Sequence, residues 1–103
     1  MNDATRKKIE SDVKGNRVMV YMKGTAEQPM CGFSGRVVEI FKSYQVPFKT
    51  FNILEDEEIR NSIKEYSDWP TIPQIFIDGE FIGGCDIITE MHNNGDLAKL
   101  LKK

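Results

Sequence analysis

One cysteine in this sequence lies where its thiol is well suited to chemistry. Cys31 follows the apolar run Arg17–Met22 and a loop, and it directly precedes a helical pattern that begins at Gly32. The unpaired N–H groups and the positive dipole end of a helix start favour the thiolate form of a cysteine. Such a thiolate serves as a nucleophile or as a metal ligand. The alternative is a cysteine whose position is incidental.

The tetrapeptide Cys-Gly-Phe-Ser at 31–34 has the spacing of a C-x-x-C redox motif whose second cysteine is replaced. The Ser34 hydroxyl does not close a disulfide, so a mixed disulfide at Cys31 has to wait for an outside thiol. A structural zinc site takes about four ligands, often in closely spaced pairs. This sequence offers three cysteine or histidine ligands, Cys31, Cys85 and His92, and none of them are paired in that way. For Cys85 two possibilities stay open: a disulfide bridge to Cys31, or a buried and inert thiol. His92 is expected to have no chemical role.

The hydrophobic pattern predicts the elements that place Cys31. Residues 3–14 have the pattern of an amphipathic helix, and Arg17–Met22 that of a strand buried on both faces. The later predicted elements are a helix from Gly32, a strand over Phe48–Ile53, a helix beginning within 55–58, strands over Gln74–Ile77 and Glu80–Ile82 joined by an Asp78-Gly79 turn, and two closing helices. This order predicts an α/β fold: a four-stranded mixed sheet flanked by helices on both faces. With no repeat or linker, residues 1–103 are expected to form a single domain.

Composition excludes two classes of partner. The 103 residues carry 14 basic and 16 acidic side chains, a net charge of -2, so no positive excess is available to hold a phosphate backbone and no nucleic acid is expected. The apolar runs are far shorter than the roughly 20 residues of a membrane span. The N-terminal residues mix acids with bases and lack an apolar signal core. The composition therefore predicts a cytosol-like soluble protein. The preferred compartment is a bacterial cytoplasm, with an organelle matrix after transit-peptide cleavage as the second choice.

Four ordered motifs resemble those of the CGFS-type monothiol glutaredoxins, and the resemblance spans nearly the whole chain. The motifs are the strand end Met22-Lys23-Gly24, the tetrapeptide at 31–34, Trp69-Pro70-Thr71-Ile72-Pro73, and Gly83-Gly84-Cys85-Asp86. The resemblance implies a thioredoxin-like (glutaredoxin) fold with a glutathione-binding groove. It also implies that the principal role is to hold and pass on a [2Fe-2S] cluster, in iron–sulfur cluster storage and transfer and in iron homeostasis.

The resemblance assigns the residues that bind the glycyl and cysteinyl parts of glutathione. Lys23 and Arg60 are implied as cations for the glycyl carboxylate. From the residues alone, Lys23 would be a solvated charge, and Arg60 would pair with Glu57 or Glu65. The Ile72–Pro73 bond is implied to be cis, which leaves the backbone of Ile72 free to pair with the cysteinyl backbone of glutathione.

The remaining assignments concern the γ-glutamyl end and the surroundings of Cys31. Backbone N–H groups at Gly84 and Cys85 suit the γ-glutamyl carboxylate, and Asp86 suits its ammonium group. Asp86 is also a candidate N-cap of the helix that follows. The supporting residues around Cys31 and the proline are Gly32, Phe33, Ser34 and Thr71. Trp69 is expected to be structural, with its large ring shaping the groove wall.

Ligand counting predicts how a cluster would be held. A [2Fe-2S] cluster takes four ligands, usually thiolates, and one chain has two cysteines. In a dimer, each subunit supplies either Cys31 with one glutathione thiolate, or Cys31 with Cys85. The resemblance selects the first arrangement, a cluster-bridged homodimer. It further implies BolA-like proteins and iron–sulfur scaffold or recipient proteins as partners.

Two other functions stay open from the sequence. One is a glutathione-dependent thiol-disulfide oxidoreductase that removes glutathione from proteins through Cys31. The other is a redox-sensing adaptor switched by glutathionylation of Cys31. Because Ser34 is not a thiol and the loop from Lys23 to Cys31 is long, we expect any such enzymatic activity to be weak.

Overall fold

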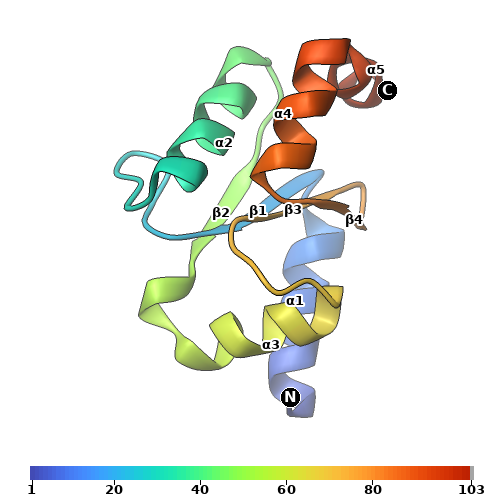
Figure 1. Ribbon diagram of the computed structural model, residues 1–103. Helices are drawn as coiled ribbons and strands as arrows, with labels where there is room; N and C mark the ends of the chain where they lie inside the picture. Colours follow the sequence, from blue (N-terminus) through green and yellow to red (C-terminus); the bar gives the residue numbers. More distant parts are fainter. Residues whose placement is uncertain (103) are drawn as a thin grey trace.

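The computed structural model describes residues 1–102, which form a central sheet with helices on both of its sides (Figure 1). In chain order the elements are α1 (Asp3–Gly15), β1 (Val18–Met22), α2 (Gly32–Ser43), β2 (Lys49–Asn52), the 3-10 helix η1 (Ile53–Glu55), α3 (Glu57–Ser67), β3 (Gln74–Ile77), β4 (Glu80–Gly83), α4 (Cys85–Asn94) and α5 (Asp96–Leu101). The strand order is β2-β1-β3-β4. Strands β1 and β2 are parallel, and the other two pairs are antiparallel. The predicted four-stranded mixed sheet is confirmed.

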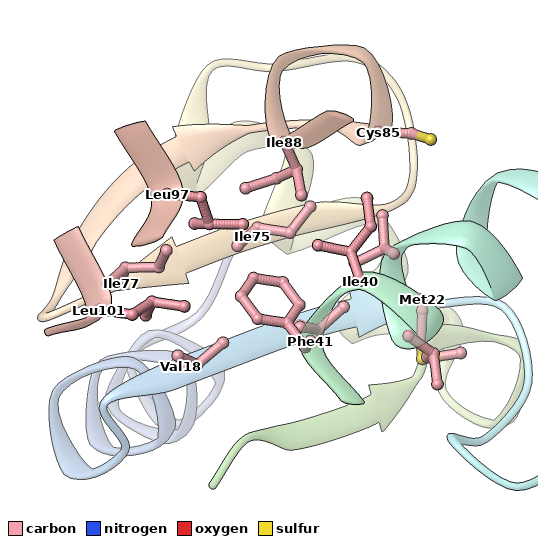
Figure 2. Close-up of a cluster of buried hydrophobic side chains, with 13 residues drawn as sticks. Val18, Met22, Ile40, Phe41, Ile75, Ile77, Cys85, Ile88, Leu97 and Leu101 are labelled. Carbon is pink, nitrogen blue, oxygen red and sulfur yellow. The ribbon is translucent and has the colours of Figure 1, made fainter. Parts of the chain in front are cut away.

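The sheet separates two hydrophobic cores because strand β1 is buried on both faces, as predicted. Val18, Val20 and Met22 contribute to the core beneath α2, α4 and α5. Figure 2 shows Phe41 of α2 reaching over β1 and β3 in this core. Met19 and Tyr21, which alternate along β1 with those three residues, contribute to the core beneath α1 and α3. Side chains of a strand alternate between faces, so an uninterrupted apolar run specifies a central strand covered on both sides.

Local signals fix several element ends. Asp78 and Gly79 both have positive φ, 52° and 83°, which is the two-residue turn that joins strands β3 and β4 with the correct twist. The Asp56 carboxylate accepts a hydrogen bond from the Ile59 N–H at 3.0 Å and so caps α3. The strand predicted over Phe48–Ile53 is shorter in the structure, because Asn52 caps the 3-10 helix that begins at Ile53.

The fold brings the ends of several helices, strands and loops together around one cavity. The exit of β1, the start of α2, the loop before β3 and the start of α4 all border the same cavity, which is described below. Among residues 1–102, no helix combines the length and the apolar character that crossing a membrane requires.

Candidate functional site

A cavity of about 570 Å³ collects residues that are distant in the sequence. Its lining includes every residue that the sequence analysis assigned to glutathione, together with two of the supporting residues: Lys23, Cys31, Phe33, Arg60, Thr71, Ile72, Pro73, Gly84, Cys85 and Asp86. Four further residues complete the lining: Lys64, Trp69, Pro70 and Ile87. The remaining two supporting residues, Gly32 and Ser34, lie in the first turn of α2 and are not part of the lining.

Cys31 is the N-cap residue of α2, and its free thiol is partly exposed. Partial burial by itself raises the pKa of this thiol, but four other groups outweigh that effect. The backbone N–H groups of Ser34 and Phe33, the Ser34 hydroxyl and the charge of Lys23 together bring the pKa of Cys31 below its ordinary value. The thiolate predicted from the helix start is thus supported by the geometry around it.

Ser34 connects the thiol to the strand that carries Lys23. Its side chain is fully buried, and its Oγ accepts a hydrogen bond from the Lys23 N–H at 3.2 Å. The same hydroxyl favours the Cys31 thiolate. Ser34 therefore has a structural role at the position where a second cysteine would stand in a C-x-x-C motif.

We expect Cys31 to be alkylated at lower pH than an unperturbed cysteine. Only the thiolate reacts, so a lowered pKa moves the midpoint of the rate–pH curve downward. Iodoacetamide rates measured between pH 5 and pH 10 in a Cys85→Ser background report Cys31 alone. Ser34→Ala should move the midpoint upward, because it removes a group that favours the thiolate. A midpoint at or above that of a free cysteine would contradict this environment.

Three cations and one carboxylate line the cavity. Within residues 1–102, none of Lys23, Arg60 and Lys64 has a carboxylate oxygen within 4.0 Å. The alternative partners considered for Arg60 are therefore not used, and Glu65 instead lies 3.5 Å from the amino group of Met1. Lys64 was missed in the sequence analysis. Its signal was its position four residues after Arg60, one turn along the same helix face.

The loop before β3 presents backbone groups to the cavity. The Ile72–Pro73 peptide bond is cis, as the resemblance implied. Within residues 1–102, neither the N–H nor the C=O of Ile72 has a backbone partner. Trp69 also lines the cavity, as expected for the groove wall, and its indole packs against Phe81 with ring centroids 5.7 Å apart. The free backbone groups are available to an extended ligand.

The start of α4 forms the opposite part of the lining. Gly84 is the N-cap residue of this helix, and a Cβ atom there would lie 3.2 Å from the Pro73 carbonyl oxygen. The prediction of Asp86 as an N-cap is wrong, because the helix begins at Cys85 and Asp86 is its second residue. Its exposed carboxylate makes no capping bond and is available to a ligand.

The two other candidate ligands for metals are held by protein contacts. Cys85 is 8% exposed, and its sulfur lies 3.9 Å from the Thr89 hydroxyl. His92 Nδ1 lies 2.7 Å from the Tyr44 hydroxyl and joins the ends of α4 and α2. In the described part of the chain, no group of three or more His, Cys, Asp or Glu side chains is arranged to hold a metal ion.

The sheet topology, the cis proline and a solitary cysteine at the start of α2 define a thioredoxin-like protein with a monothiol site. Residues 18–82 match the glutaredoxin family. The chain is 54% identical over 100 residues to the mitochondrial monothiol glutaredoxin-S15 of Arabidopsis thaliana, covering 97% of this chain and 59% of that relative. It is 51% identical to an uncharacterized ycf64-like monothiol glutaredoxin of Synechocystis, covering 99% and 95%. The chain belongs to the glutaredoxin family and is a monothiol glutaredoxin.

Solved structures support the same assignment. Reduced apo GrxS14 from poplar has a TM-score of 0.84 and 47% identity, over 94% of this chain and 89% of that one. The holo form of glutaredoxin C1 from Populus has a TM-score of 0.85 and 27% identity, over 97% and 88%. A buckwheat glutaredoxin–glutathione complex has a TM-score of 0.85 and 26% identity, over 96% and 88%. The thioredoxin-like fold is therefore confirmed.

Proposed function

We propose that this monothiol glutaredoxin binds glutathione in the cavity and carries a [2Fe-2S] cluster between two subunits. The observation that carries the proposal is the partly exposed Cys31 thiol at the start of α2, beside a cavity lined by three cations and one carboxylate. The thiol has no neighbouring cysteine at position 34 with which to form a disulfide. Its role is then to remain a ligand or to react with an external thiol.

The charges of the cavity match those of glutathione. At neutral pH the tripeptide has two carboxylates and one ammonium group. Lys23 and Arg60 would bind the glycyl carboxylate, and the N–H groups at the start of α4 would bind the γ-glutamyl carboxylate. Asp86 would bind the ammonium group, and the backbone of Ile72 would pair with the cysteinyl residue. This arrangement would bring the glutathione sulfur to the part of the cavity that Cys31 lines.

A cluster would need two chains. Each subunit would contribute the Cys31 thiolate and one glutathione thiolate, which completes the four ligands. Met30 and Phe33 flank Cys31 and expose 66% and 63% of their surface. Exposed apolar side chains at such a position suit contact with a second subunit or a recipient protein. Because glutathione supplies half of the ligands, the dimer would be labile, as a cluster carrier requires.

Relatives support parts of this proposal. One related structure is a holo glutaredoxin, and another is a glutaredoxin–glutathione complex. Relatives come from a cyanobacterium, from Rickettsia and from mitochondria. We propose a bacterial cytoplasm as the compartment, with an organelle matrix as second choice, and BolA-like proteins and iron–sulfur scaffold or recipient proteins as partners.

The mass and colour of the protein purified without oxygen test the proposal. Native mass spectrometry should find a dimer with one [2Fe-2S] cluster and two glutathiones, and the sample should absorb visible light. A colourless monomer that stays colourless after incubation with iron, sulfide and glutathione would refute the carrier function. Rapid turnover in an assay coupled to glutathione reductase would favour the oxidoreductase function in its place.

Lys23→Ala should weaken glutathione binding about tenfold, the expected loss of one charge-assisted hydrogen bond. The folded chain should be retained, because the Lys23 backbone and not its side chain makes the contacts with Ser34 and Met30. Titration followed by NMR measures the affinity, and thermal unfolding measures the stability. Lys99→Ala, which removes an exposed charge on α5, is the matched control and should leave both unchanged. Equal affinities for the Lys23 and Lys99 variants would contradict the assignment.

A further inference from the structure

Asn52, the last residue of β2, joins two segments that lead to the cavity. Its side-chain Oδ1 accepts a hydrogen bond from the Gly24 N–H at 2.9 Å and another from the Leu54 N–H at 3.0 Å. Gly24 directly follows Lys23. Leu54 belongs to η1, which leads through the capping residue Asp56 into α3 and its Arg60. One oxygen atom therefore ties together the main-chain segments that carry the cations of the cavity.

Further hydrogen bonds hold the main chain at Lys23. The Lys23 N–H donates to Ser34 Oγ at 3.2 Å, and the Lys23 carbonyl accepts from the Met30 N–H at 2.9 Å. With the bond from Gly24 to Asn52, three consecutive backbone groups are fixed by α2, by the loop and by the end of β2. The main chain at Lys23 is therefore a rigid base for a long, flexible side chain.

The segment on the Arg60 side depends on Asn52 for its start. Asn52 is the N-cap of η1, and its register partner across the sheet is Met22, the residue before Lys23. Loss of Oδ1 would leave the N–H groups of Gly24 and Leu54 without their partner at the same time. The spacing between the two cation-bearing segments would then depend on the pairing of β1 with β2 and on the packing of α3 in the core.

We propose that Asn52 is a positioning residue that sets Lys23 and Arg60 at the separation needed to bind one carboxylate together. The inference rests on the proposed glutathione function, and it adds a residue that does not line the cavity. Asn52 acts through the other two residues and does not touch the ligand. Its effect should therefore appear only for ligands that have the glycyl carboxylate.

Two probes separate positioning from a general structural role: reduced glutathione and its glycyl ethyl ester, which lacks that carboxylate. Asn52→Ala should bind glutathione about tenfold more weakly than the unmodified protein, the fold-change of one lost charge-assisted contact. The ester should bind the variant and the unmodified protein with the same affinity. Asn52→Asp, which keeps the Oδ1 acceptor, should restore most of the affinity for glutathione. NMR titrations measure all five affinities.

Two further measurements complete the test. Asn94→Ala removes a comparable bond, from the Asp96 N–H to Asn94 Oδ1 at 2.9 Å, at the distant α4–α5 junction. This control should bind glutathione normally. In a Lys23→Ala background, Asn52→Ala should cost less affinity than it does in the unmodified protein, because the two substitutions weaken the same carboxylate contact and are not additive.

The outcomes are distinguishable. Unchanged glutathione binding in Asn52→Ala, or equal losses for glutathione and the ester, overturns the positioning role and leaves the proposed function intact. Failure of the unmodified protein to bind glutathione overturns both. Loss of glutathione affinity alone, with recovery in Asn52→Asp, supports the inference.

Discussion

Cys31→Ser should abolish the visible absorption of protein reconstituted with iron, sulfide and glutathione, whereas Cys85→Ser should retain most of it. Each subunit of the proposed dimer gives one protein thiolate, and serine oxygen is a poor substitute for a soft sulfur ligand. Cys31 is partly exposed beside the cavity. Cys85 is buried, with its sulfur directed toward Thr89 at 3.9 Å. The two replacements are chemically identical, so each serves as the control for the other.

The source of the other two ligands can be tested in the same experiment. S-methylglutathione keeps all the charges of glutathione but lacks a free thiol. Reconstitution with it should give no cluster, even though the cavity is filled. Iron, sulfide and glutathione contents per dimer, with the absorption spectrum, measure the result, and thermal unfolding verifies that both variants are folded. If the absorption were lost in Cys85→Ser but kept in Cys31→Ser, Cys85 and not Cys31 would be the cluster ligand from the protein.

The order and type of the elements could be predicted because the signals for them are local. The apolar run of β1 indicated burial on both faces, and the Asp78-Gly79 pair indicated the hairpin. The end of β2 was placed one residue too far, because Ile53 is apolar enough to extend a strand. What ends the strand is the side chain of Asn52, which binds Gly24 and Leu54. The bond to Gly24 spans 28 residues of sequence. The bond to Leu54 is a local cap, which the apolar pattern of the predicted strand conceals.

The site was predicted in part from the residues and in part from the resemblance. The position of Cys31 followed from a strand followed by a helix, whereas the cis bond before Pro73 came from the resemblance alone. The error at Asp86 has a simple cause. Glycine is also a common N-cap, and α4 begins directly after Gly84. Lys64 could have been included from its one-turn spacing to Arg60.

Gly24→Ala should lower the free energy of unfolding by at least about 2 kcal/mol. Gly24 has a φ of 90°, which side-chain-bearing residues rarely adopt. A Cβ atom at this position would lie 2.5 Å from the Gln28 carbonyl oxygen and 2.6 Å from the Met30 nitrogen. Both atoms belong to the backbone of the loop, so neither can move away as the end of a flexible side chain could. The unfolding temperature should fall by roughly 8 °C or more.

Gly15→Ala is the matched control, because a Cβ there meets no atom within 4 Å and the residue lies within helix α1. This variant should be unchanged or more stable, by up to about 1 kcal/mol. The contrast also bears on the site, since the loop displaced in Gly24→Ala holds the main chain of Lys23 through Met30. Glutathione affinity should therefore fall in the Gly24 variant even at temperatures where it is fully folded. An unfolding temperature within about 2 °C of the unmodified protein, a shift worth less than 1 kcal/mol, would mean that the loop yields easily and does not hold Lys23 in place.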